Sequence, residues 1–400
     1  MELTVVSTYF PLPADRGDPV RVLMMLRALS RVRGYTLSVV RRPETTGEQV
    51  ARLRELLPGV EVRDFPATPY RLGRLGPAGR YPEALAAGLP PWVRTRYSAA
   101  LHADLRTRTG AGLAIGEAAG AYFPGTGLRW HWDKANVLSA SARQDAREAP
   151  GFVDRLRARY LTRVSGGFES RALSRAATVS VTSTEESARL ARYHGRAADV
   201  TLPSCVEIPA GHLPRPRERT LVWLGSFAYR PNVLGLLRFL DEGWAALHRV
   251  GYTMTLVGSG PSAGLRHAVA AHPGVELAGY VEDLAPVLAP ARAAMVPLWS
   301  GAGVKLKTLT LLAHAVPVFA TPAGAEGIPP SLAVRVADSP AALAGQLLSC
   351  TAEDLDRMAH EAPRLIEREF SERRFAQRLV DALERVGVLD PTGPVPREGS

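Results

Sequence analysis

The chain has 400 residues, of which 46% are hydrophobic and 22% charged, as in a soluble globular protein that can bury full hydrophobic cores. At roughly 100–200 residues per domain, this length predicts two or three domains. The formal net charge of +10 favours phosphorylated partners, an anionic lipid surface or nucleic acid, but the arginines are scattered and no nucleic-acid-binding motif is present.

Cysteine use and hydrophobic patterning indicate a cytoplasmic protein. Cys205 and Cys350 are far apart and lack metal-ligand spacing, so we expect a reducing compartment, with no disulfide and no zinc. Residues 1–30 lack the basic segment, apolar run and cleavage site of a signal peptide. No apolar run reaches the roughly 18 residues of a membrane span. A weak peripheral association with the inner membrane surface stays open.

The first half of the chain alternates short apolar strands with helices. We expect strands at residues 3–7, 35–40, 60–65, 113–115, 136–138, 178–182 and 200–202. Helices are expected at 19–31, after Asp18 as the N-cap and Pro19 as first residue, at 46–57 and at 92–106. The Gly-, Pro- and Arg-rich stretch from 66 to 94 is typical of a long loop with broken helices.

Residues 152–175 form an arginine-rich amphipathic pattern, which predicts a helix that can break at Gly166 and Gly167. Such a helix could lie on anionic lipid. The alternative, a solvated helical face, is the favoured interpretation.

The second half repeats the alternation after a proline-rich linker at 203–220. Strands are expected at 221–224, 253–257, 275–278, 293–298, 318–320 and 333–336, with helices between them and an amphipathic helix at 375–386. The Pro/Gly-rich tail from residue 390 is expected to be disordered. Two alternating βα halves predict two parallel-sheet domains of the Rossmann type that face each other across a cleft.

The stretch from 297 to 321, PLWSGAGVKLKTLTLLAHAVPVFAT, predicts a strand end, a glycine loop, a helix and another buried strand. The positive end of a helix after such a loop suits an anion. Lys305 and Lys307 lie there, and the chain has only one other lysine, Lys134, although it has 49 Lys and Arg residues. A lysine pair where arginine is the usual cation indicates a compact charge for a diphosphate, and a solvated first helical turn is the alternative.

Five segments of the second half, in order, resemble the nucleotide-binding domain of GT-B glycosyltransferases: LGSFAYRPN, LVGSGP, GYVEDL, VPLWSGAGVKLK and PVFATPAGAEGI. The segment FPLPADRGDPVR resembles the N-terminal loop of the same enzymes. The closest resemblance is to the retaining "glycosyl transferases group 1" enzymes. It covers most of residues 1–25 and 220–330.

The resemblance implies an enzyme that moves a sugar from a nucleotide diphosphate sugar, GDP- or UDP-linked, to an acceptor. It implies no cofactor and no metal, because protein cations replace the metal at the diphosphate. The acceptor is expected to be a natural-product scaffold or a polysaccharide or lipid-linked intermediate. The domains are expected at 1–205 (acceptor) and 220–370 (donor), with a linker at 206–219, a helix at 371–389 that crosses back to the N-terminal domain, and a tail at 390–400.

The resemblance also assigns site residues. Lys307, Arg230 and Asp18 are expected to be catalytic. Acceptor-binding residues are expected at the N-terminal domain: Asp18, Arg21, Glu117 and His131. Donor-binding residues are expected mostly in the C-terminal domain: Gly17, Ser226, Arg230, Gly258, Val281, Gly301, Ala302, Gly303, Val304, Lys305, Lys307, Thr310 and Glu326.

Two positions depart from the family pattern. The family carries two glutamates around the helix after the glycine loop, and here Ala302 and Thr310 occupy those positions. The second glutamate binds the ribose hydroxyls, so Thr310 at this position predicts weaker binding of the ribose. The histidine that the family often shows after the strand expected at 136–138 is replaced by SASARQD, and His131 lies upstream.

Several assignments keep alternatives. Glu326 either hydrogen-bonds the donor sugar or caps its turn, and Glu117 is either a cleft residue or a solvated loop carboxylate. For the whole chain, the alternatives to a glycosyltransferase are a catalytically silent nucleotide-sugar binder and, from charge alone, a nucleic-acid binder. No nucleic-acid partner is expected.

Overall fold

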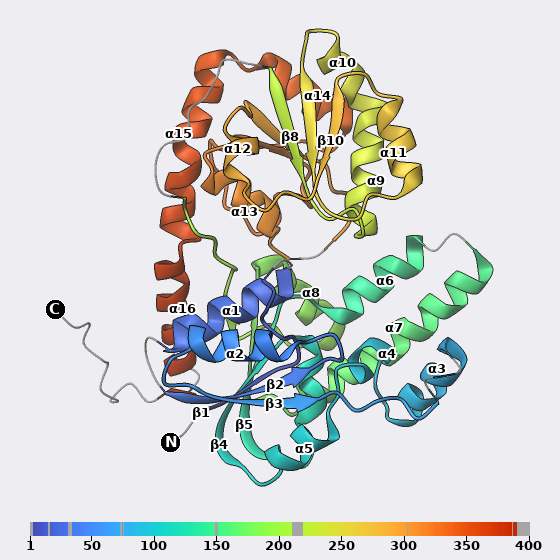
Figure 1. Ribbon diagram of the computed structural model, residues 1–400, viewed down its shortest axis with the longest axis vertical. Coiled ribbons are helices and arrows are strands. Elements are labelled where there is room, and N and C mark those ends of the chain that lie inside the picture. Colours follow the sequence, from blue (N-terminus) through green and yellow to red (C-terminus); the bar gives the residue numbers. More distant parts are fainter. Residues whose placement is uncertain are drawn as a thin grey trace, which may run out of the picture. The chain divides into compact units, whose positions relative to one another are not determined.

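The computed structural model describes residues 3–14, 17–30, 34–72, 74, 76–148, 151–209, 219–301, 303–385 and 387–389. Ala302, most of the expected linker and the tail from residue 390 lie outside this described part. The chain divides into two compact units, Met1–Pro203 with Phe375–Ser400, and Ser204–Arg374 (Figure 1). The helix α16 (Glu372–Arg385) therefore returns to the first unit, as the sequence predicted.

The first unit is built on a seven-stranded parallel sheet in the order β3-β2-β1-β4-β5-β6-β7. Its strands are β1 (Leu3–Ser7), β2 (Tyr35–Arg41), β3 (Glu61–Pro66), β4 (Thr109–Ile115), β5 (Gly127–Lys134), β6 (Thr178–Val181) and β7 (Val200–Thr201). The register places Val5 between Leu37 and Leu113. β1 lies inside the sheet: the chain adds β2 and β3 on one side of it and then β4 to β7 on the other side.

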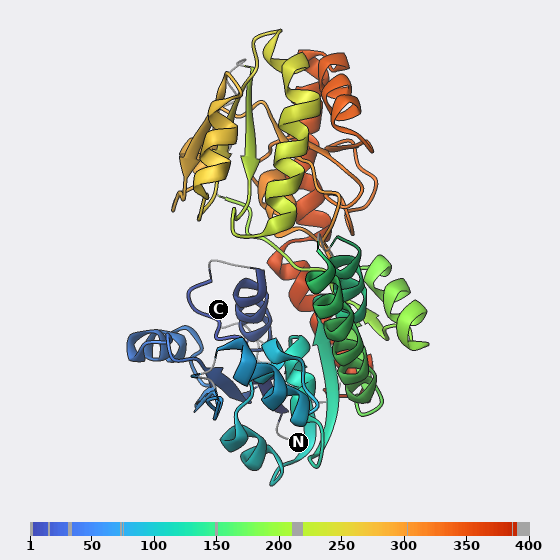
Figure 2. The same ribbon diagram turned by 90° about the vertical axis from the view of Figure 1, so that its right-hand side faces the viewer.

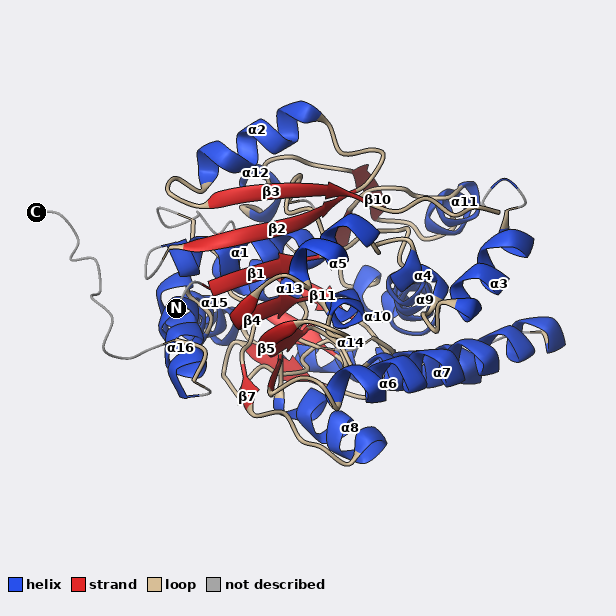
Figure 3. Cartoon of the chain, turned by 90° about the horizontal axis from the view of Figure 1, so that it is seen from below, coloured by secondary structure: helices blue, strands red, loops and turns tan. Residues whose placement is uncertain are grey.

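Helices cover both faces of this sheet, and α1 and α2 lie on the face opposite to α5 (Figures 1 and 3). The helical segments between the strands are α1 (Gly17–Ser30), α2 (Gly47–Leu56), α3 (Pro77–Ala86), α4 (Pro91–Arg94), α5 (Ala99–Leu105), η2 (Glu117–Tyr122), α6 (Leu138–Glu148), α7 (Phe152–Leu173) and α8 (Thr184–His194). Burial on both faces explains why the central strands read as nearly continuous apolar runs.

The second unit holds a six-stranded parallel sheet in the order β10-β9-β8-β11-β12-β13. The strands are β8 (Thr220–Leu224), β9 (Thr253–Val257), β10 (Val275–Gly279), β11 (Ala293–Val296), β12 (Val318–Ala320) and β13 (Val334–Val336). The helical segments are α9 (Arg230–Phe239), η3 (Leu240–Trp244), α10 (Ala245–His248), α11 (Ala263–Ala270), α12 (Ala285–Leu288), α13 (Leu306–Ala313), α14 (Pro340–Ser349) and α15 (Ala352–Glu369).

Two apolar cores lie on the two faces of this second sheet. Trp223 of β8 packs with α9, η3, α11 and α14 on one face. Val222, the preceding residue, packs with α12, α13 and α15 on the other face. The separation of neighbouring side chains to opposite faces follows from the period of two in a strand, and Figure 2 shows this layered unit from the side.

The structure corrects the expected elements in the middle of the first unit. The strand is β5 at Gly127–Lys134, and the residues expected as a strand at 136–138 lead into α6 instead. β5 was missed because His131 and Asp133 interrupt its apolar pattern, although both are buried and hydrogen-bonded. The expected helix at 92–106 is two helices, and α7 continues through Gly166 and Gly167 without a break.

Candidate active site

The donor-site candidates of the second unit follow the carboxyl ends of its strands. Ser226 follows β8, and the glycine loop at 301–303 follows β11. These two strands are neighbours, and the chain leaves β8 toward β9 on its other side. Ligands of open α/β sheets bind at the carboxyl ends of strands where the winding reverses in this way.

The glycine loop has the backbone conformation that its residues predict. Gly301 and Gly303 have φ angles of 111° and 72°, which side chains other than glycine rarely adopt. The Gly303 N–H donates to the Glu326 carboxylate at 3.1 Å, and that carboxylate is buried. Glu326 therefore caps the loop, which is one of the two roles expected for it. This N–H is thus already bonded to a carboxylate in the structure.

Lys305 is tied to the glycine loop itself. Its ammonium donates to the carbonyl oxygens of Gly303 and, at 3.4 Å, Gly301, and lies 3.8 Å from the Glu326 carboxylate. Lys305 is also the residue that precedes the first turn of α13. The carboxylate partly neutralises this lysine, so much of its charge is used to hold the loop.

Lys307 has a different environment. Its ammonium donates to the side-chain oxygen of Asn232 at 2.8 Å and lies 5.1 Å above the ring of Trp223. Among the described residues it has no carboxylate partner. Burial, together with the nearby charge of Lys305, lowers the pKa of Lys307 to about 7. A cation that faces only an amide and an aromatic ring keeps its charge available for an anionic ligand.

Asn232 is the site residue that the sequence interpretation missed. Its side-chain amide donates to the Ser226 carbonyl at 2.9 Å while its oxygen accepts from Lys307. It therefore connects the loop after β8 to the start of α13. Asn232 could have been found from the sequence, because it lies in the LGSFAYRPN segment, two residues after Arg230.

The other donor-site candidates have more varied surroundings. Arg230 is exposed at the start of α9 and makes no ion pair within the described chain. A Cβ at Gly258 would overlap the Gly225 carbonyl, so this glycine is required by the packing of two loops. The Thr310 hydroxyl donates to the Leu306 carbonyl at 2.9 Å within α13. Val281 and Val304 are half-buried and pack against the core that includes α13.

The first unit contains a cavity of about 160 Å³ at the carboxyl ends of β1 and β2. Its lining combines aromatic, cationic and acidic side chains: Thr8, Tyr9, Phe10, Leu12, Pro13, Asp18, Pro19, Arg42, Glu44, Thr45, Gln49 and Arg96. Asp18, expected at the acceptor side, lies in the first turn of α1, immediately after Gly17. This cavity again lies where the winding of a sheet reverses, between β2 and β4.

Electrostatics link the acidic residues of this region. Burial, the charge of Glu117 and the charge and hydrogen bond of Asp18 raise the pKa of Tyr9. Burial and the charge of Asp18 raise the pKa of Glu117 to about 7, against the opposing effect of Lys134. Glu117 is buried and accepts from the Asn136 N–H at 2.8 Å, so it is not the solvated loop carboxylate of the alternative interpretation. Arg96 stacks over the Tyr9 ring at 4.6 Å.

Arg21 and His131 lie inside the first unit. Arg21 is buried and donates from two nitrogens to the two oxygens of Asp133, at 2.9 and 2.7 Å. His131 is buried in β5, where its ring nitrogens bond to the hydroxyls of Thr178 and Ser180 at 2.9 and 3.0 Å. Burial lowers the pKa of His131 to about 4, so the ring is neutral. These placements favour structural roles over the acceptor contacts expected from the sequence.

A buried polar cluster forms where the family often carries its histidine. Glu169 of α7 accepts from the backbone N–H groups of Leu138 and Ser139, both at 2.9 Å. The same carboxylate lies 2.8 Å from both Lys134 and His194. Lys134 and Glu169 side chains are fully buried, and Lys134 lowers the pKa of Glu169 in opposition to burial. The cluster anchors the start of α6, and no pattern along the sequence joins its residues.

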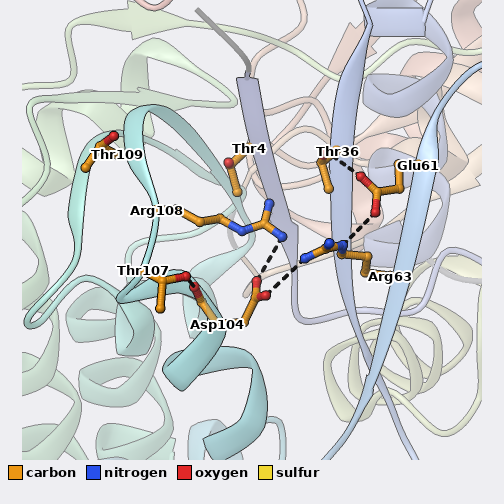
Figure 4. Close-up of a pocket in the computed structure, with 8 residues that line it drawn as sticks. All are labelled: Thr4, Thr36, Glu61, Arg63, Asp104, Thr107, Arg108 and Thr109. Carbon is orange, nitrogen blue, oxygen red and sulfur yellow. Dashed lines mark hydrogen bonds and ion pairs between the residues drawn. The ribbon is translucent and has the colours of Figure 1, made fainter.

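A second cavity of about 360 Å³ lies at the opposite, amino ends of the strands of the first unit (Figure 4). Its charged side chains pair with one another: Arg63 bonds to Glu61 at 2.7 Å and to Asp104 at 3.0 Å, and Arg108 lies 2.9 Å from Asp104 (Figure 4). These alternating pairs hold β3 to the end of α5, and we assign no ligand to this cavity.

Solved glycosyltransferases have the same two-sheet fold. HepE of Anabaena, in complex with UDP, is 14% identical over 96% of this chain and 100% of its own, with a TM-score of 0.65. A glycosyltransferase from Rickettsia africae is 11% identical over 96% and 98%, with a TM-score of 0.63. WaaG, a glycosyltransferase involved in lipopolysaccharide biosynthesis, is 16% identical over 98% and 100%, with a TM-score of 0.58. At these identities the likeness shows the fold.

The fold defines the class: the chain has the two-sheet GT-B fold of these glycosyltransferases. Within that class, residues 218–353 match the family described as Glycosyl transferases group 1, the family that the sequence motifs resemble. No curated protein matches the sequence.

The described residues contain no group of three or more His, Cys, Asp or Glu side chains arranged to hold a metal ion. None of their helices is long and apolar enough to cross a membrane.

Proposed function

We propose that the protein transfers a sugar from a UDP-linked donor to an acceptor hydroxyl, with retention of the anomeric configuration and without a metal ion. The observation that carries the proposal is the environment of Lys307, whose ammonium, among the described residues, contacts the Asn232 side chain and the Trp223 ring. A half-buried lysine with no carboxylate partner in the described part of the chain is suited to a diphosphate. UDP is preferred over GDP because HepE, which shares the fold, has been solved with UDP and with UDP-glucose.

In this proposal the donor binds to the second unit. The diphosphate contacts Lys307 and the exposed Arg230, the sugar lies beside the glycine loop, and the base contacts the segment that ends at Val281. The bond between the anomeric carbon and the phosphate oxygen breaks, and its electron pair leaves with UDP. Lys307 stabilises the negative charge that grows on the departing diphosphate.

The acceptor binds to the cavity of the first unit in this proposal. Asp18 orients the acceptor hydroxyl, whose oxygen forms the new bond to the anomeric carbon. The hydroxyl proton passes to the departing phosphate oxygen, so no separate protein base is required. A soluble scaffold and a lipid-linked or polysaccharide intermediate are both compatible with this cavity, and a cytoplasmic location is part of the proposal.

The first experiment is a thermal-shift panel of UDP, GDP, ADP and TDP. A nucleotide at about 100 times its dissociation constant adds about 2.7 kcal/mol to the stability of the folded state, which is readily seen as a rise in melting temperature. We expect the largest rise with UDP. Equal or absent shifts with all four nucleotides would contradict the donor assignment.

The alternative is a catalytically silent nucleotide-sugar binder. Thr310 favours it, because a hydroxyl that already donates within α13 replaces the glutamate expected to hold the ribose. Mass spectrometry of UDP-glucose incubated with the protein and a panel of acceptors separates the two functions. Transfer or slow hydrolysis supports the enzyme, and UDP binding without either supports the silent binder.

A further inference from the structure

The tip of one helical hairpin exposes a cluster of apolar side chains. Helices α6 and α7 lie side by side, and α7 begins at the outer end of the pair (Figures 1 and 3). Its first residues, Phe152, Val153 and Leu156, are 76%, 75% and 60% exposed. Other exposed large apolar side chains of the described chain occur singly or in pairs. Adjacent exposed apolar side chains at a protruding helix end indicate a contact surface.

Arginines surround this apolar tip, together with one exposed carboxylate, Asp154, in the first turn of α7. Arg147 of α6 and Arg155, Arg159 and Arg163 of α7 are exposed, and none makes an ion pair with any described residue. Phe152, Leu156, Arg159 and Arg163 are spaced by four, three and four residues, so they share one face of the helix. At 1.5 Å per residue, Arg159 and Arg163 lie about 5–10 Å behind Leu156 along the helix, whereas Arg155 lies beside the apolar side chains.

The rest of the hairpin is firmly attached to the first unit. The second half of α7 buries Phe168, Glu169 and Leu173. Near the tip, the Thr162 hydroxyl donates to the Ala142 carbonyl of α6 at 3.0 Å, and Arg157 donates to the Tyr81 hydroxyl of α3 at 2.7 Å. The exposed large apolar side chains of α7 therefore lie in its first turns alone, and they are presented on a fixed support.

We propose that the tip of the α6–α7 hairpin docks the protein on an anionic lipid bilayer. The apolar side chains enter the boundary between headgroups and acyl chains, and the arginines contact the lipid phosphates. Interfacial helices bury their apolar face by about 5–10 Å, which matches the distance at which Arg159 and Arg163 lie behind Leu156. Charge complementarity selects lipid over a second copy of the chain, since the four arginines outnumber Asp154 and two copies would bring them together. The proposal does not depend on the identity of the donor.

The test is co-sedimentation of the full chain with vesicles of equimolar phosphatidylglycerol and phosphatidylcholine, with pure phosphatidylcholine vesicles as reference. We expect binding to the anionic vesicles that weakens with salt, and little binding to the neutral ones. The double variant Arg155→Gln with Arg159→Gln should bind about 30-fold more weakly, at about fivefold per arginine. The variant Phe152→Ser with Leu156→Ser should lose at least about tenfold.

Matched controls lie in the second unit. Arg249→Gln with Arg266→Gln removes two exposed arginines elsewhere, and Leu234→Ser removes an exposed leucine. These controls should bind vesicles as the unchanged protein does. The melting temperature and its response to UDP should be the same in all variants, which separates lost docking from lost folding or lost donor binding.

Three results would overturn the proposal. The first is equal binding to neutral and anionic vesicles, and the second is vesicle binding that both tip variants retain. The third is a dimer in sedimentation velocity that the Phe152→Ser and Leu156→Ser substitutions dissociate, which would assign the tip to a second copy of the chain.

Discussion

The ammonium of Lys307 and the side-chain oxygen of Asn232 lie 2.8 Å apart, although the two residues are 75 positions apart in the chain. Lys305, two residues away, is instead 3.8 Å from the Glu326 carboxylate. One lysine of the pair thus faces a neutral amide and the other an acid. This difference assigns them different roles and leads to the first two predictions.

Replacing Lys307 with alanine should weaken donor binding about 10–150-fold, because a charge-assisted hydrogen bond to phosphate contributes roughly 1.5–3 kcal/mol. It should also slow transfer, since the same cation stabilises the leaving diphosphate. Lys305→Ala should reduce donor affinity less and lower the melting temperature more, because Lys305 bonds to the carbonyls of the glycine loop. Calorimetry with UDP and turnover of both variants test this. Unchanged affinity in Lys307→Ala would place the anion site elsewhere.

Donor binding should weaken as the pH rises above about 7. The pKa of Lys307 in the free protein is lowered to about 7, and only the charged lysine attracts the diphosphate. Below that pH the charge is present and affinity should be level. Above that pH, Lys307 must take up a proton when the donor binds. The affinity for the donor should therefore fall by up to about tenfold per pH unit.

Titration of the protein with UDP-glucose from about pH 6 to about pH 9 measures this dependence, since its phosphodiesters do not titrate near neutrality. The matched variant is Lys307→Arg, whose guanidinium stays charged throughout. A flat profile in Lys307→Arg and a falling one in the unchanged protein support the assignment. Identical profiles would assign the pH dependence to another group.

Thr310→Ala should weaken nucleotide binding by about 0.5–1.5 kcal/mol if its oxygen accepts from a ribose hydroxyl. The bond that Thr310 donates to Leu306 leaves its oxygen able to accept. Comparison of UDP with its 2′-deoxy analogue isolates the ribose contact, because the alanine variant should discriminate less between them. Thr310→Glu is expected to strengthen UDP binding. The prediction fails if the alanine variant retains the full preference for ribose.

Gly258→Ala should destabilise the second unit by about 1–3 kcal/mol or more, because its Cβ would overlap the Gly225 carbonyl and force the two loops apart. Gly345→Ala is the matched control, since nothing lies within 4 Å of the Cβ that it would add. Denaturant unfolding of both variants gives the comparison. Equal stability of the two would show that the loops around Gly258 separate without cost.

The sequence alone determined the two parallel-sheet units and the glycine loop with its lysines, and the family resemblance implied the returning C-terminal helix. The sheets and the loop follow from local signals: apolar periodicity marks most strands and helices, and glycines mark positive φ angles. The prediction failed at β5, where His131 and Asp133 are polar but buried. Their partners are Ser180 and Arg21, and a pattern along one segment contains no information about such distant partners.

Only the tertiary structure showed the surroundings of chemically similar residues. The family resemblance singled out Lys307 over Lys305, and the second unit places Lys305 beside Glu326 and Lys307 beside Asn232. The same holds for the arginine-rich helix α7, whose exposed large apolar side chains are limited to its first turns because its second half packs into the first unit. Burial and charge pairing depend on contacts between residues far apart in the chain, so the folded structure decides which charges remain available to a ligand or a membrane.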